Sequence, residues 1–142
     1  MRLKSLISWS NNMSVGVSDI DDDHRSMIEE ISLLYAFRKD HSREEIIDKV
    51  SDLLDHTSRH FDNEESYMRA MNYGKLDEHY QIHQLFMEQI TQIERNLVED
   101  PRSQLTDARL NDIARWLFNH ILTEDKDYAV FAATCRATIP AE

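Results

Sequence analysis

Glycine and proline are scarce in this chain of 142 residues, with only two of each. An all-β domain needs many tight turns, which these two residues usually supply, so their scarcity argues against strands and favours helices. The length is enough to bury one substantial core but is short for two ordinary domains. We therefore expect residues 1–142 to form a single all-α domain.

Cysteine is rarer still, because Cys135 is the only one. One cysteine excludes an internal disulfide and is compatible with a reducing compartment. The basic opening loses its apolar character after Ile7, too early for a signal peptide, and no apolar run is long enough to span a bilayer. We expect a soluble cytoplasmic protein that does not enter a membrane.

Positive charge is also in short supply: 16 Lys and Arg stand against 27 Asp and Glu, a formal net charge of −11. No basic patch stands out, so nucleic acid is not an expected partner. The oligomeric state stays open, with a monomer favoured because the acidic surface shows no obvious apolar patch.

Apolar residues at steps of three and four predict four amphipathic helices. After an extended arm over residues 1–20, the helices are expected at about 21–37, 43–71, 75–98 and 107–123. Ser42 and Glu45 have the spacing of a capping box, and Gly74 suits the left-handed position after the second helix. Four such helices with short connections predict an up-down-up-down four-helix bundle, with a short C-terminal segment after the fourth helix.

Histidine occupies positions on these helices where a core would otherwise have leucine. His60 and Glu64 are four residues apart, as are His79 and His83, so each pair lies on one face of its helix. Both pairs fall on the stripes that should face the core. The candidates from all four helices are His24, His60, Glu64, His79, His83, His120 and Asp125.

Burying five imidazoles in an apolar core is costly, at about 1–3 kcal/mol for each unpaired group, and a bound metal removes that cost. Five nitrogens and two carboxylates suit iron better than calcium or magnesium, and seven ligands exceed what one zinc ion holds. We therefore expect two iron ions (Fe2+/Fe3+) with an oxo or hydroxo bridge. With about six positions on each ion, one stays open for a small ligand such as O2.

In these motifs the chain resembles the hemerythrin family, in particular its single-domain bacteriohemerythrins. The family pattern is a histidine in the first helix followed by H-x3-E, H-x3-H and H-x4-D, and all seven positions are occupied here. Trp9 in the arm, Val15-Gly16-Val17 and Trp116-Leu-x-x-His120 also match. The resemblance covers almost the whole chain and implies a helical bundle whose non-haem diiron centre binds O2 reversibly.

The resemblance also implies which ion each ligand would hold. One iron would be held by three histidines, His79, His83 and His120. The second iron, which carries the open position, would be held by His24 and His60. The ions would be bridged by two carboxylates, Glu64 and Asp125.

The choice of Asp125 conflicts with simple helical spacing. Residues five apart on an α-helix diverge by about 140°, so spacing from His120 favours Glu124. The family pattern favours Asp125, which requires the fourth helix to loosen or end near Thr123.

An O2 site must be dry, because water or anions at the open iron promote oxidation to an inactive diferric form. Four apolar residues lie next to the ligands or one turn away and are candidates to line the pocket: Phe61, Trp116, Leu117 and Ile121. Each can equally be an ordinary core residue. His56 is expected beside the site rather than in it, and His41, in the first turn of the bundle, is assigned no role.

Reversible O2 binding for storage, delivery or sensing is therefore the expected function. We do not expect an enzyme, although a weak peroxidase or oxidase side activity is compatible with such a site. The first alternative is a diiron enzyme that consumes peroxide or nitric oxide. Carboxylate-rich diiron oxidases use paired Glu-x-x-His motifs, which this chain lacks. The second alternative is an iron-responsive binding module.

Overall fold

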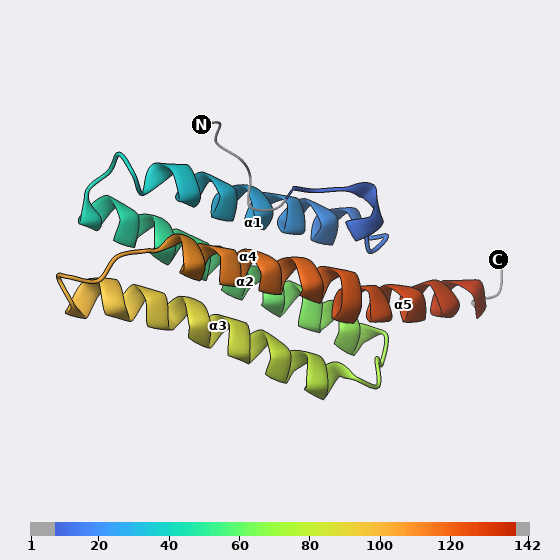
Figure 1. Ribbon diagram of the computed structural model, residues 1–142. Helices are drawn as coiled ribbons and strands as arrows, with labels where there is room; N and C mark the ends of the chain where they lie inside the picture. The colour runs from blue at the N-terminus through green and yellow to red at the C-terminus, as the bar shows by residue number, and fades with distance from the viewer. Residues whose placement is uncertain (1–7, 139–142) are drawn as a thin grey trace.

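Four long antiparallel helices form the body of the protein, as Figure 1 shows for the computed structural model. The structure describes residues 8–138, and every regular element in this range is helical. The long helices are α1 (Ser18–Phe37), α2 (Arg43–Ala70), α3 (Leu76–Glu99) and α4 (Asp107–His120). The predicted fold class, an all-α up-down-up-down bundle, is confirmed.

The N-terminal segment differs from a simple extended arm. Residues 1–7 of the predicted arm lie outside the described residues, and a short 3-10 turn, η1 (Asn11–Met13), precedes α1. Helix α1 begins at Ser18 rather than near Asp21. The Asp21 carboxylate accepts hydrogen bonds from Ser14 Oγ at 2.5 Å and from the Val15 amide at 2.8 Å. Asp21 thus ties the arm to the first turn of α1.

The two ends of α2 show one correct prediction and one wrong one. At its start, Ser42 and Glu45 form the predicted capping box, in which each side chain accepts from the other residue's amide. At its end, Asn72 rather than Gly74 takes the left-handed conformation, with a φ of 55°. The Tyr73 amide donates to the Met68 carbonyl at 3.0 Å, which satisfies a helix-end carbonyl. Asparagine tolerates this conformation, so the turn closes before the glycine.

The chain stays helical beyond the end of α4 at His120. Its backbone widens into a π-helical turn, η2 (Ile121–Asp125), and continues as α5 (Lys126–Thr138). The predicted short C-terminal segment is therefore a helix, which projects past the α2–α3 turn in Figure 1. The helix loosens near this point, as predicted, and α4 itself stops at His120, three residues before the expected end at about residue 123.

Two apolar clusters and a polar layer share the interior. The larger cluster, here the main core, includes Met27, Phe86, Ile90 and Leu110. The smaller cluster comprises Val15, Ile20, Met68 and Tyr128, where the arm, α1, α2 and α5 meet. The polar layer between them, here the ligand layer, consists of His24, His60, Glu64, His79, His83, His120 and Asp125. Apolar side chains therefore close the ligand layer on both sides.

Candidate metal centre

The structure brings together all seven predicted ligands. Each is buried, with at most 3% of its surface exposed. The ligand atoms fall into two groups, and within each group they lie within 4.8 Å of one another. One group consists of Glu64, His79, His83, His120 and Asp125; the other consists of His24, His60 and Glu64. Each group has a donor set that can hold a metal ion.

The two carboxylates lie between the groups, with one oxygen facing each side. Glu64 Oε1 is 3.1 Å from His83 Nε2, and Glu64 Oε2 is 3.2 Å from His24 Nε2. Asp125 Oδ1 is 2.9 Å from His79 Nε2 and 3.1 Å from His120 Nε2. Asp125 Oδ2 is 3.1 Å from His24 Nε2. Both carboxylates therefore have the orientation of a bridge between two cations.

The π-helical turn explains how Asp125 reaches this position. In a π-helix the hydrogen bonds run from residue i to i+5, so residues five apart come close to one face. Asp125 therefore turns inward beside His120 and is fully buried. The Glu124 side chain is 35% exposed and lies 2.9 Å from His120 Nδ1. Glu124 contacts the outer nitrogen of His120, and Asp125 faces the inner one.

Carboxylates outside the ligand layer orient three of the histidines. His60 Nδ1 is 3.1 Å from Asp23, and His83 Nδ1 is 2.7 Å from Glu65. Glu124 does the same for His120. An imidazole that donates from Nδ1 presents the lone pair of Nε2, so these contacts aim the inner nitrogens at the centre.

Tyr128 is a further supporting residue that the sequence reasoning missed. Its hydroxyl donates to Glu64 Oε2 at 2.7 Å, and its ring is fully buried. Burial, followed by the nearby charges of Glu64 and Asp125, raises the Tyr128 pKa, so the hydroxyl keeps its proton. Tyr128 follows Asp125, the last residue of η2, by three residues, which is about one helical turn. This spacing puts the two on the same side of the helical stretch and is the signal that could have identified Tyr128. The roles of Asp23 and Glu65 could not be predicted from the sequence, because they depend on how neighbouring helices pack against each other.

The residues in the ligand layer fit a bound cation because many of their polar atoms have no other partner. Among the residues that the structure describes, buried atoms without a hydrogen bond include His60 Nε2, His79 Nε2, Glu64 Oε1 and both carboxylate oxygens of Asp125. His83 Nε2 and His120 Nε2 face each other at 3.1 Å. Both of these rings have a carboxylate at Nδ1, so their inner nitrogens present two lone pairs to one space. A cation there would satisfy atoms that otherwise stay unpaired.

The electrostatics also favour positive charge at this centre. Burial on its own would lower the pKa of His24, but Asp125 and Glu64 outweigh it and raise that pKa to about 10. Burial likewise opposes charge on His120, whereas Asp125 and other carboxylates raise its pKa to about 10. Burial and the nearby charge of Glu64 would raise the pKa of the Asp125 carboxyl, but the contacts with His120 and His24 outweigh them and lower it. Protons or metal cations can supply the positive charge that the carboxylates stabilise.

The four predicted pocket residues lie around the imidazoles. Phe61 stacks on His83, with ring centroids 3.7 Å apart. Trp116 is half-buried and stacks on His120, with centroids 4.6 Å apart. Leu117 and Ile121 are buried in the main core. Phe61 and Trp116 therefore contact imidazoles of the ligand layer directly, whereas Leu117 and Ile121 are core residues on the helical stretch that carries His120.

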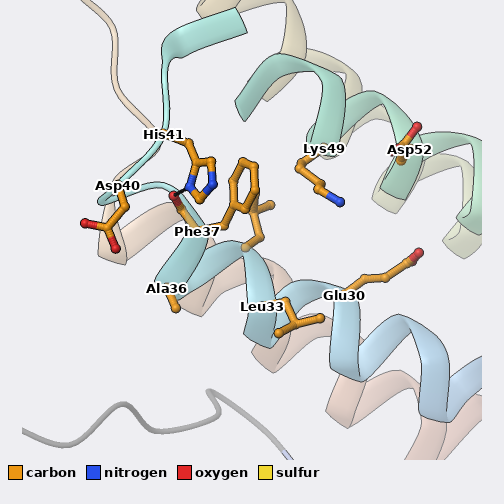
Figure 2. A pocket seen from close by; sticks show the side chains of 9 residues that line it. Glu30, Leu33, Ala36, Phe37, Asp40, His41, Lys49 and Asp52 are labelled. Atoms are coloured by element: carbon orange, nitrogen blue, oxygen red, sulfur yellow. Dashed lines mark hydrogen bonds between the residues drawn. The ribbon is translucent and has the colours of Figure 1, made fainter. Parts of the chain in front are cut away.

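The two other histidines lie outside the ligand layer. His56 Nδ1 is 2.8 Å from Glu30, and His56 Nε2 is 3.7 Å from Asp23, so His56 lies beside the centre. His41 stacks on Phe37 next to a cavity of about 400 Å³ between α1 and α2, shown in Figure 2. The cavity is lined from α1, from the following turn and from the first half of α2.

The fold and the cluster define a class: a helical bundle with a buried histidine–carboxylate centre able to hold metal. The sequence profile of the hemerythrin HHE cation binding domain matches residues 15–132. The chain belongs to the hemerythrin family. The resemblance inferred from its motifs is confirmed.

Individual relatives agree with this assignment. The chain is 28% identical to a bacteriohemerythrin of Stenotrophomonas maltophilia over 125 residues, covering 88% of this chain and 80% of the relative. It is 30% identical to a bacteriohemerythrin of Pseudomonas paraeruginosa over 122 residues, covering 84% and 77%. It is 27% identical to hemerythrin subunit beta of Lingula anatina, covering 90% and 97%. A crystal structure of wild-type hemerythrin shares the fold, with a TM-score of 0.80 at 22% identity, covering 87% of this chain and 95% of that one.

Within residues 8–138, no helix combines the length and the apolar character needed to cross a bilayer.

Proposed function

We propose that this protein binds O2 reversibly at a non-haem centre of two iron ions with an oxo or hydroxo bridge. The observation that carries the proposal is the division of each carboxylate between two groups of imidazoles. One oxygen of Glu64 lies near His83 and the other near His24, and Asp125 is divided in the same way. Two bridged cations would satisfy the buried atoms that lack partners.

Each iron (Fe2+/Fe3+) would have its own set of imidazoles. One ion would be held by His79, His83 and His120. The other would be held by His24 and His60, with Glu64 and Asp125 shared between the two ions. The group with two histidines has fewer protein donors, so an ion held there would have the open position for O2. When bound in the ferrous state, the ions supply the electrons that hold O2.

The chain itself holds the ligands and keeps the centre dry. Phe61 packs flat against His83, and Leu117 and Ile121 are buried in the main core, within three residues of His120 in the chain. Trp116 covers the outer side of His120. We propose that these four residues limit the access of water and anions, which promote loss of the ferrous state. Tyr128 holds Glu64 in its bridging position through a hydrogen bond.

Absorption spectra of the iron-loaded protein test this function. We expect a new band on exposure of the reduced protein to O2, and we expect the band to disappear when O2 is removed and to return on re-exposure. Steady consumption of added peroxide or nitric oxide over many turnovers would instead support a diiron enzyme. An iron-free form that stays folded and binds a partner would support an iron-responsive module. Either result without reversible O2 binding would overturn the proposal.

We also propose that the protein is a cytoplasmic monomer whose ligand is O2. Its net charge of −11 favours repulsion between copies, and its single cysteine suits a reducing compartment. Sedimentation velocity at micromolar concentration should give one species near the chain mass of 16.8 kDa. A concentration-dependent larger species would contradict the monomer.

A further inference from the structure

A groove lies between α3 and α4, and one of its lining residues, Trp116, also contacts the ligand layer. Two hollows of about 500 and 780 Å³ lie between α3 and α4, and they share Trp116 and Arg109 in their lining. Trp116 is half-buried, so its indole forms part of the groove wall and also contacts the interior.

Aromatic contacts connect this groove to the centre by two routes. In the direct route, the Trp116 ring stacks on His120, with centroids 4.6 Å apart and planes 22° apart. In the second, Trp116 stacks on Phe86 at 4.2 Å, Phe86 contacts Phe61 at 6.1 Å, and Phe61 stacks on His83 at 3.7 Å. Both routes end on histidines of the same group, the one that also contains His79. The other group, with His24 and His60, is the proposed O2 side.

The charge of the groove is opposite to that of the protein as a whole. Three arginines line it, Arg95, Arg109 and Arg115, against two acidic residues, Glu88 and Asp112. The chain carries a net charge of −11, so this is a locally basic surface on an acidic protein. Leu85, which is 57% exposed, adds an apolar contact beside Trp116. Tryptophan and arginine are the residues that contribute most often to protein interfaces.

A protein that binds O2 at ferrous iron also needs a surface through which its oxidised centre can be reduced again. Each oxidation to the diferric state removes two electrons from the centre, and the apolar wall that keeps water out also keeps out hydrated reductants. Electrons must then arrive through the protein. Electron-transfer partners form small, transient contacts of less than about 1,200 Å², for which a shallow groove is sufficient.

We propose that the α3–α4 groove is the docking site of a small acidic protein that carries a one-electron redox group, and that Trp116 passes its electrons to the centre. The proposal rests on the diiron function above. In each encounter the carrier would lose one electron and one ferric ion would gain it and become ferrous; if the bridge changes from oxo to hydroxo, it takes one proton from solvent. Two encounters restore the O2-binding state. Electrons thus arrive on the three-histidine side while O2 uses the other side.

Stopped-flow reduction of the oxidised holoprotein tests this proposal. Reduced flavodoxin serves as the acidic one-electron probe, and dithionite serves as the small reductant. With flavodoxin we expect the Arg109→Glu/Arg115→Glu variant to react about tenfold more slowly than the wild type at low salt, and the difference to shrink at high salt. The matched control is Arg59→Glu/Arg69→Glu, which makes the same charge change at exposed positions on α2. It should react clearly faster than the groove variant.

Substitution of Trp116 separates docking from electron transfer. Trp116→Leu removes the stack on His120 and should slow flavodoxin more than dithionite, whereas Trp116→Phe keeps an aromatic ring and should recover part of the rate. Equal slowing by the two arginine pairs would overturn the docking site. A Trp116→Leu rate equal to the wild type, or equally slowed with both reductants, would overturn the electron route. If Trp116→Leu does not fold, the rates of Trp116→Phe test the electron route and the rates of the two arginine pairs test the docking site.

Iron content and absorption bands distinguish a failure of this docking proposal from a failure of the proposed O2-binding function. Variants that keep the iron and the spectrum of the wild type but show no loss of flavodoxin rate would overturn the groove alone. A wild-type protein without two irons would overturn both proposals.

Discussion

The main core and the ligand layer are built on the same helical stripes, yet they are stabilised in different ways. In the main core, residues such as Phe86, Ile90 and Leu110 are satisfied by burial itself. In the ligand layer, residues such as His79 and Asp125 are buried just as deeply but have polar atoms without partners. The first region is stabilised by packing alone, and the second has a donor set that can hold a metal ion. Substitutions in the two regions should therefore have different signatures.

The largest expected effect comes from removing a ligand. His83→Ala deletes a nitrogen that faces Glu64 and leaves Glu65 without its partner. We expect iron affinity on that side to fall by more than the roughly 10–100-fold that loss of an orienting contact costs. Metal analysis of the purified variant should show a large loss of iron, and thermal unfolding should shift downward because bound metal stabilises the fold. Full iron content in this variant would contradict the ligand assignment.

A cavity in the main core should give the opposite pattern. Leu110 is fully buried there, so Leu110→Ala should lower the free energy of unfolding by about 2–5 kcal/mol. Chemical denaturation measures this loss. The variant should keep the iron content of the wild type, since Leu110 is no part of the ligand layer. Iron loss as large as that of His83→Ala would mean that the two regions are not separable.

Glu124→Gln tests the support around the ligand layer. The Glu124 carboxylate contacts Nδ1 of His120. Replacing it by an amide should hold the imidazole less firmly in the orientation that points Nε2 at the centre. We expect iron affinity to fall by about 10–100-fold while iron still binds at saturating concentration. Competition with a chelator of known affinity gives the value. A complete loss of binding would indicate that Glu124, and not Asp125, is a direct ligand.

The smallest effect is expected far from both regions. Ser42 caps α2 by accepting from the Glu45 amide, and Ser42→Ala should cost about 1 kcal/mol of unfolding free energy. Iron content and O2 spectra should stay unchanged. A change in either would show that the end of the bundle is coupled to the centre.

Regular spacing explains which parts of this structure could be predicted from the sequence. The pairs His60–Glu64 and His79–His83 follow from the fixed period of the α-helix, which places residues four apart on one face. The bundle follows from four amphipathic stripes with short connections. The capping box follows from a local contact between Ser42 and Glu45.

The features that were missed depend on departures from regular geometry or on tertiary packing. Helical spacing alone pointed to Glu124, and Asp125 was predicted only through the family pattern, because the π-helical turn that brings it inward departs from regular spacing. The closing turn of α2 uses Asn72 where glycine was expected, because both residues tolerate positive φ and spacing does not rank them. The contacts of Asp23 with His60 and of Tyr128 with Glu64 join different helices, so no single stretch of sequence contains them.

The iron content of the purified protein tests the central claim most directly. Elemental analysis, normalised to protein concentration by amino-acid analysis, gives the number of irons in each chain. The divided carboxylates and the two groups of imidazoles predict two. A value of one or none after loading with excess ferrous iron under anaerobic conditions would contradict the account.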